Sequence, residues 1–241
     1  MAEAVWVASA RSSYGNTTPG DQNGGREVSR EKYYVHSKGW YVIRAKDPAA
    51  REKIALAMEH ACDNNDIGYS QPTRLTLYND VKAFGFDPAK TTKPVNTDCS
   101  ALVRVCVHYA GITVDNFITS NEVSMLMATG KFELFKDDEH CKSSDHLLRG
   151  DILVTRTKGH TVVVLNDGAK AAEERQSAPV ETGDLLVASG SWNLRRGPGT
   201  QYDVVKTVHG GDRLTGVDAG NWVPVQVGGA VCWISPKAIE G

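Results

Sequence analysis

Residues 97–111 read TDCSALVRVCVHYAG. A polar turn runs into Cys99, and a mostly apolar run rich in β-branched residues follows as far as Gly111. The run is too long for a typical strand, and Gly111 stands where a helix commonly ends, so the pattern predicts a buried helix with Cys99 in its first turn. Unpaired backbone N–H groups and the helix dipole favour a thiolate there, and the thiolate is the nucleophilic form of cysteine. The alternative is that Cys99 is a small buried apolar side chain, as many free cysteines are.

Composition and charge limit the possible functions. The chain has 241 residues, enough for one large domain or two modest ones, and its formal net charge is −2. This balance provides no basic field for nucleic acid or an anionic membrane, and no apolar stretch reaches membrane-spanning length. The N-terminus has no long apolar core, so we expect no signal peptide. We therefore expect a monomer made in the cytoplasm, with no nucleic-acid partner and no membrane insertion, which reaches an extracellular target only after release.

Five cysteines are present, and none are paired at Cys-x-x-Cys spacing. The odd number and the spacing argue against a disulfide framework and against a structural zinc site. His60 lies near Cys62 and His140 adjoins Cys141, but two such short pairs are weak evidence for a metal. We expect no metal, no other cofactor, and synthesis in a reducing compartment.

A second informative stretch, residues 149–165, reads RGDILVTRTKGHTVVVL. Two β-rich runs flank a Lys-Gly pair and predict a hairpin or two adjacent strands. His160 begins the second strand, where its side chain can project from the edge of the sheet. The continuous apolar run from Val162 to Leu165 implies that both faces of this strand are covered.

The segments around these two stretches predict further elements. Asp47 followed by Pro48 is a strong helix start, and apolar residues between 54 and 62 recur at helical spacing. Glycine-rich residues 15–29 predict a long loop, and charged residues 137–144 predict an exposed loop. The remaining expectations are strands at residues 4–9, 40–44 and 131–135, and helices at residues 74–83 and 120–130.

The character of the sequence changes after residue 168. Residues 169–184 are rich in Ala, Glu, Ser and Pro without apolar periodicity, which predicts a linker. Residues 185–241 contain short β runs separated by close turns, as in a small β barrel. This region has no pair of nucleophile and base, so we expect it to bind rather than catalyse. The expected organisation is one domain at residues 1–168, the linker, and the barrel.

Three segments of the N-terminal region resemble motifs of the NlpC-type cysteine peptidases of bacterial cell walls, a superfamily that includes the CHAP amidases. They are the nucleophile motif at residues 98–103 (DCSALV), the Gly-Asp strand at residues 149–154 (RGDILV), and the strand opened by the catalytic histidine at residues 159–165 (GHTVVVL). Cys99 and His160 are 61 residues apart, which suits the family. The resemblance implies a papain-like α+β fold for residues 1–168.

The resemblance also implies a mechanism. Cys99 would attack an amide carbonyl in a stem peptide of peptidoglycan, and His160 would take the thiol proton and pass it to the leaving amine. Tyr69 is the best match to a family tyrosine near the oxyanion site, although it lacks the usual glycine pair and lies 30 residues before Cys99. Asp98 and Ser100 are expected to help hold the substrate's amine, with capping and packing as their alternative roles.

The polar residue that orients the histidine in relatives is missing from its usual place. Asn166 is six residues along the same strand, roughly 20 Å from His160 at ~3.3 Å per residue, and is too distant. The other candidates, from a strand returning beside His160 or from the glycine-rich loop, are Glu173, Glu174, Asp21 and Gln22. The choice among these stays open.

The C-terminal region resembles a bacterial Src-homology-3-like domain. The segments that carry the resemblance are residues 193–200 (NLRRGPGT), Tyr202, Trp222 and residues 231–234 (VCWI). In relatives such modules bind wall peptide or glycan and tether a hydrolase to its substrate. Tyr202, Trp222 and Trp233 could line a groove, but the two tryptophans could equally belong to the barrel core. The combination resembles a phage or prophage endolysin, with bacterial peptidoglycan as its partner and substrate.

Two other functions remain open. A cytosolic peptidase that recycles muropeptides would use the same chemistry on small soluble peptides. A non-catalytic wall-binding protein would contain a decayed peptidase domain, against which the presence of both Cys99 and His160 argues. The bond cut is also open among the D-glutamyl bond to the diamino acid, a cross-bridge and the muramoyl-alanine amide.

Overall fold

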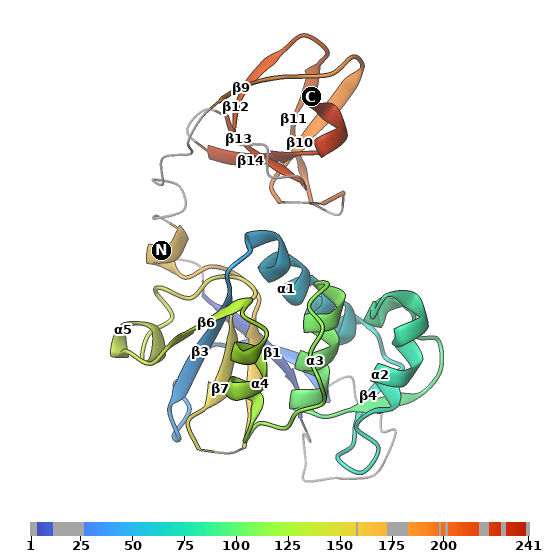
Figure 1. The fold of residues 1–241 in the computed structure, drawn as a ribbon, viewed down its shortest axis with the longest axis vertical. Coiled ribbons are helices and arrows are strands. Elements are labelled where there is room, and N and C mark those ends of the chain that lie inside the picture. Colours follow the sequence, from blue (N-terminus) through green and yellow to red (C-terminus); the bar gives the residue numbers. More distant parts are fainter. Residues whose placement is uncertain are drawn as a thin grey trace. The chain divides into compact units, whose positions relative to one another are not determined.

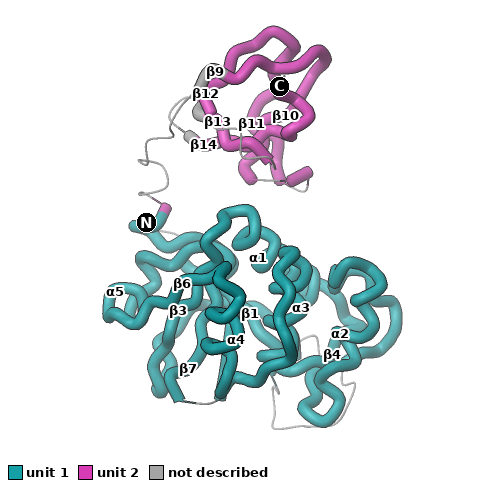
Figure 2. Tube along the Cα trace, in the orientation of Figure 1, with its two compact units in different colours: residues 1–171 teal, residues 172–241 magenta. Residues whose placement is uncertain are grey.

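The computed structural model describes residues 4–11, 27–157, 159–172, 183–197, 199–200, 202–216, 222–227 and 230–239. It divides into two compact units, residues 1–171 and residues 172–241 (Figure 2). Each unit has its own six-stranded sheet and its own buried core. None of the helices within the described ranges combines the length and the apolar character needed to cross a membrane.

An antiparallel sheet in the order β2-β1-β8-β7-β3-β6 forms the centre of the first unit. Every residue of β8 is buried, which confirms that this strand is covered on both faces. The strands are β1 (Trp6–Ala10), β2 (Val28–Lys32), β3 (Trp40–Ala45), β6 (Phe132–Phe135), β7 (Ile152–Thr155) and β8 (Thr161–Val164).

Two helices, α1 (Pro48–Asp63) and α3 (Cys99–Tyr109), pack on each other and on β1 and β8 (Figure 1). The larger core lies between these helices and the sheet, and it takes Val163 from β8. Val162 and Val164 belong to a second core on the opposite face, because successive strand residues point to opposite sides. As predicted, α1 begins at Pro48, where the Asp47 carboxylate accepts a hydrogen bond from the Ala49 N–H.

A small parallel pair of strands, β4 (Ile67–Tyr69) and β5 (Val95–Thr97), leads into α3. Tyr69 is paired with Thr97, two residues before Cys99. The chain between β4 and β5 forms α2 (Thr76–Val81) and two short 3-10 helices, η1 (Lys82–Phe84) and η2 (Pro88–Lys90). This excursion therefore returns the chain to the side of Tyr69.

The Arg-Gly-Asp segment before β7 anchors the sheet to α1. Arg149 forms ion pairs of 2.7 Å with both Glu52 and Glu59 of α1. Gly150 has φ +87°, and a Cβ added there would lie 2.0 Å from the Arg51 carbonyl oxygen. Asp151 is fully buried and accepts hydrogen bonds from Arg44 at 2.8 and 2.7 Å. In this structure the motif thus serves packing and buried ion pairing.

One expectation about the loops was wrong, and another loop was expected to extend too far. Residues 137–144 contain a helical turn, α5 (Asp138–Cys141), because Asp137 caps it by accepting from the His140 N–H, and Cys141 is buried. Residues 15–26 of the expected glycine-rich loop lie outside the described residues, and only its expected end at residue 29 was wrong, because β2 begins at Val28 and pairs with β1. Asp21 and Gln22 lie outside the described residues. The helix expected at residues 120–130 is α4 (Glu122–Ala128).

The second unit is an antiparallel sheet in the order β11-β10-β14-β13-β12-β9. Its buried core is aliphatic apart from Cys232, whereas Trp222 and Trp233 are partly buried. A Cβ added at Gly197 would lie 2.6 Å from Cδ1 of the Tyr202 ring, so the ring packs against this glycine. The elements are β9 (Gly183–Leu186), β10 (Ser191–Arg195), β11 (Val204–His209), β12 (Arg213–Gly216), β13 (Val223–Val227), β14 (Ala230–Ile234) and the 3-10 turn η3 (Pro236–Ala238).

The close approach at Gly150 makes a stability prediction with a matched control. Gly150→Ala and Gly111→Ala both place a side chain at positive φ, +87° and +84°, but only Gly150 has a neighbouring backbone in the way. We expect Gly111→Ala to lower the free energy of unfolding by about 1 kcal/mol and Gly150→Ala by roughly 3 kcal/mol or more. Urea denaturation of the two variants measures this, and equal losses would contradict the packing argument.

Candidate active site

Cys99 is the first residue of α3, and only Asp98 separates it from the end of β5. Asp98 caps the helix, since its Oδ1 accepts hydrogen bonds from the Ala101 N–H at 2.7 Å and from the Ser100 hydroxyl at 3.0 Å. The helix was thus predicted correctly, with its cysteine in the first turn.

Arg74 holds the other side of this cap. Its guanidinium lies 2.6 Å from Asp98 Oδ2 and donates to the Ser100 hydroxyl at 3.2 Å and to the Phe117 carbonyl at 2.5 Å. Both Asp98 and Ser100 are buried. Their observed contacts are those of capping and packing, and the role expected for them in holding a substrate amine stays a prediction.

His160 stands just before β8, and Thr155 at the end of β7 fixes its backbone. The Thr155 N–H donates to the His160 carbonyl at 3.0 Å, and the His160 N–H donates to Thr155 Oγ1 at 3.1 Å. The His160 ring reaches β1, where its Nε2 lies 3.2 Å from Ser9 Oγ. Ser9 is 1% exposed, so this contact is shielded from water.

The start of β8 joins the histidine strand to the cysteine. Thr161 follows His160, and its backbone hydrogen bond to the Cys99 sulfur lowers the thiol's pKa. Tyr69 lies close enough for Cys99 to raise the tyrosine's pKa, although burial is the larger cause. The structure therefore brings Tyr69, Asp98, Cys99 and Ser100 to one end of α3, beside the residue that follows His160.

Burial dominates the electrostatics of this site. Burial raises the pKa of Cys99 to about 12, and the carboxylates of Asp98 and Glu122 add to the rise. Burial also lowers the pKa of His160 to about 4, with smaller contributions from Arg11 and His36. At neutral pH the free protein therefore holds a neutral thiol and a neutral imidazole. The backbone hydrogen bonds of Thr161 and Ser100 lower the pKa of Cys99, which is the direction expected at a helix start, but burial outweighs them.

Glu122, the first residue of α4, is a buried carboxyl that the sequence analysis did not single out. Its Oε1 accepts a hydrogen bond of 2.7 Å from the Thr161 hydroxyl, and its Oε2 has no hydrogen-bond partner among the residues that the structure describes. Burial raises the pKa of Glu122 from its usual 4.5 to about 8, so the group is mostly protonated at pH 7. Its position at a helix start gave no signal of burial, because acidic residues are common and exposed in first turns.

Ser9 was also missed, and here a signal existed. It is the single polar residue among Trp6, Val7, Ala8 and Ala10, so it stands out in the run that became β1. Asn166 is engaged elsewhere, accepting from the Trp6 N–H at 2.7 Å and donating to the Ala4 carbonyl at 3.1 Å. Glu173 and Glu174 lie outside the described residues, as do Asp21 and Gln22. Within the described ranges, no three His, Cys, Asp or Glu side chains are grouped to hold a metal ion.

A comparison with protein families matches residues 9–171 to the endolysin-like domain. The chain belongs to the endolysin-like domain family. The matched segment begins at Ser9 and contains both Cys99 and His160. Membership indicates a protein that lyses bacterial cell walls, with peptidoglycan as the fitting substrate. No curated protein and no solved structure matches the chain.

The raised pKa of Glu122 predicts a pH-dependent difference from Glu122→Gln, which keeps the shape and the acceptor for Thr161. Between the unfolded pKa of about 4.5 and the folded pKa of about 8, the folded wild type binds more protons than the unfolded chain. Wild-type stability relative to the variant should thus be greatest below that window and fall through it by at most about 1.4 kcal/mol per pH unit. Denaturant titrations between pH 4 and 9 test this, and a constant difference would contradict it.

Proposed function

We propose that this protein hydrolyses an amide bond in a peptidoglycan stem peptide, with Cys99 as nucleophile and His160 as general base and acid. One observation carries the proposal. The start of β8, where Thr161 follows His160, lies next to the Cys99 thiol in the first turn of α3. The family match to a wall-lysing domain supports the substrate. The rival cytosolic recycler and the non-catalytic binding protein have no observation of their own in their favour.

The neutral resting state decides how the first step proceeds. As the Cys99 sulfur attacks the carbonyl carbon, its proton passes to His160 and the carbonyl electrons move to the oxygen. His160 then gives the proton to the leaving nitrogen, the C–N bond breaks, and a thioester to Cys99 remains. Water attacks this thioester with His160 as base, which releases a carboxylic acid and restores the thiol. Because an ion pair is costly at this buried site, proton transfer accompanies attack rather than preceding it.

The developing oxyanion needs hydrogen-bond donors. The first backbone N–H groups of α3 have no carbonyl partners within the helix, and of these the Asp98 side chain occupies the one on Ala101, so that those nearest Cys99 face the substrate in this proposal. Tyr69 is held beside Cys99 by the pairing of β4 with β5. We assign the tyrosine hydroxyl to the oxyanion side of the substrate, in agreement with the family resemblance.

Ser9 takes the place of the missing third residue in this proposal. Its hydroxyl lies 3.2 Å from His160 Nε2, which leaves Nδ1 to exchange the proton with Cys99. Such a contact fixes the ring orientation and tautomer, the task of the third member in Cys-His sites. Ser9 is thus a positioning residue, supplied by the strand beside β8.

The second unit is proposed to tether the enzyme to the wall. In this account residues 1–168 are the peptidase and residues 185–241 are a Src-homology-3-like module, and β9 extends that module by two residues into the linker expected at residues 169–184. The partly buried Tyr202, Trp222 and Trp233 supply aromatic surface for wall peptide or glycan. A tether raises the local substrate concentration without changing the active site.

Clearing of purified bacterial cell walls tests the enzyme assignment. Wild type should clear walls and Cys99→Ala should not, because the nucleophile is gone. Cys106→Ala is the matched control, since it removes a fully buried thiol from the same helix, and it should still clear. Mass spectrometry of the released fragments identifies the bond. Clearing by Cys99→Ala would refute the cysteine mechanism.

The same assay separates the alternatives. A protein shortened so that its chain ends at Gly183 should cleave free stem peptides normally but clear walls more slowly. Cleavage of free peptides without clearing of any wall would favour a recycling enzyme. Wall binding without cleavage of either substrate would leave a binding protein.

The positioning role predicts a specific kinetic change. Ser9→Ala should lower kcat by roughly tenfold, with little change in KM and a shifted pH profile of kcat, because the imidazole loses its orienting contact. Ser9→Thr keeps the hydroxyl and should restore most of kcat. Equal loss in both variants, or a change in KM alone, would assign Ser9 to packing.

A further inference from the structure

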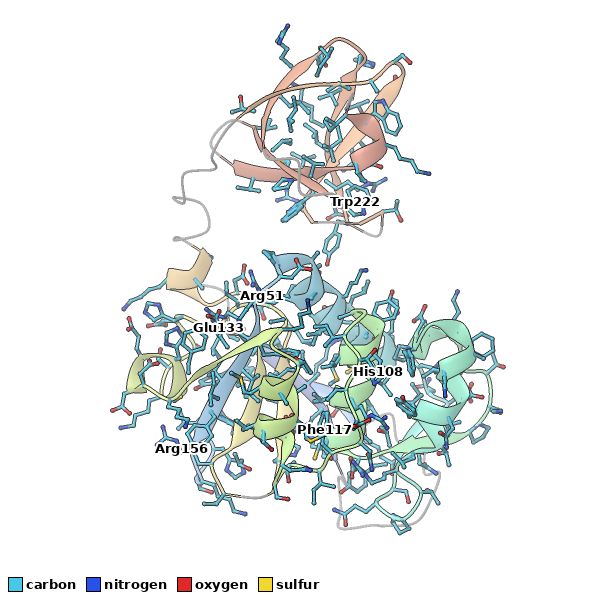
Figure 3. The ribbon with its side chains drawn as sticks, viewed as in Figure 1. Arg51, His108, Phe117, Glu133, Arg156 and Trp222 are labelled. Atoms are coloured by element: carbon cyan, nitrogen blue, oxygen red, sulfur yellow. The ribbon has the colours of Figure 1, made fainter. Side chains whose placement is uncertain are left out.

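A pocket of about 640 Å³ opens at the end of the first unit's sheet where β7 stops and β3 begins. Arg156, labelled in Figure 3, lies at this end of the sheet. The mechanism above makes no use of this pocket. Its lining includes three basic residues and several hydroxyl groups, among them Lys38, Lys136, Arg156, Tyr41, Thr119 and Ser120.

The residues that line this pocket include positive side chains but no negative ones. None of the lining residues is an Asp or a Glu. Arg156 donates to the Trp40 carbonyl at 3.1 Å and to the buried Cys141, and its guanidinium lies 5.4 Å from the Tyr41 ring centre. Lys136 is exposed, with its ammonium 5.5 Å from the same ring centre. Across the described ranges, neither Lys136 nor Arg156 is paired with a carboxylate.

The wall of the pocket is continuous with the turn that presents His160. Thr155 lines the pocket and also holds the His160 backbone. Thr119 lines it too and accepts a hydrogen bond of 3.3 Å from the Gly159 N–H. An extended substrate lying across His160 could therefore place a neighbouring residue in this pocket.

Like charges such as those of Lys136 and Arg156 repel one another, and an anion relieves that repulsion while accepting their hydrogen bonds. Threonine, serine and tyrosine hydroxyls add neutral donors. An anionic group on a flexible peptide fits this chemistry better than an apolar side chain. Beside its scissile bond, a wall hydrolase meets the side carboxylates of the stem peptide.

We propose that this pocket is a subsite for a free carboxylate of the wall peptide, held by Lys136 and Arg156. The inference rests on the proposed function for the choice of a peptide carboxylate, but the charge and lining of the pocket are independent of the mechanism. It predicts that the protein distinguishes stem peptides whose side carboxylates are free from those in which they are amidated.

Binding to Cys99→Ala protein tests this without turnover. Calorimetry with a free-carboxylate stem peptide and with its amidated form should give a Kd about five- to tenfold lower for the free form. Adding Lys136→Gln should remove most of that preference, because the described contact of Lys136 is with a ring alone. Lys90→Gln, an exposed lysine outside the pocket, is the control and should keep it.

The active protein gives a second readout. In protein that keeps Cys99, Lys136→Gln should raise KM for the free-carboxylate peptide and leave its kcat unchanged. Neither KM nor kcat for the amidated peptide should change. A carboxylate preference in binding without any hydrolysis would support the subsite and refute the proposed function. Hydrolysis with equal affinity for both peptides, or weak binding of both, would overturn the subsite. Binding of inorganic phosphate to wild type and to Lys136→Gln is measured beside peptide binding. If the substitution abolishes phosphate binding and leaves peptide binding unchanged, the carboxylate subsite is overturned in favour of a site for a phosphate polymer.

Discussion

The site depends on two of the hydrogen bonds made by Thr161. Its backbone bonds to the Cys99 sulfur, and its hydroxyl donates to the buried Glu122 carboxyl. One residue at the start of β8 therefore links the helix that carries the thiol, the helix that carries a protonated acid, and the adjacent His160. Because β8 is buried on both faces, a shift of this strand would disturb both cores.

The same burial sets the chemistry. Removing water from Cys99 and His160 moves their pKa values apart, towards a neutral pair. A neutral resting thiol is less open to oxidation and alkylation than an exposed thiolate. The rigid surroundings come from contacts far from the thiol, notably the ion pairs of Arg149 with α1 and the pairing of Asp151 with Arg44.

Local signals in the sequence predicted much of this framework. The apolar run after Cys99, the capping of α1 and the valine run of β8 each depend on neighbouring residues, and each was confirmed. Contacts between distant segments were not predictable in this way. Ser9 meets His160 across 151 residues of chain. The helical turn α5 depends on a single cap, the hydrogen bond that Asp137 accepts from the His140 N–H. The pKa of Cys99 depends on how deeply the thiol is buried, and only the folded chain defines that burial.

The most direct measurement is to look for the acyl intermediate. Wild-type protein is mixed with purified wall, quenched in acid within seconds, digested and analysed by mass spectrometry. The account predicts a thioester adduct of wall-peptide mass on Cys99, with no adduct on Cys62, Cys106, Cys141 or Cys232. The contradicting result is lysis that proceeds while Cys99 carries no adduct at any quench time. In that case alkylation of Cys99 would also leave the rate of lysis unchanged.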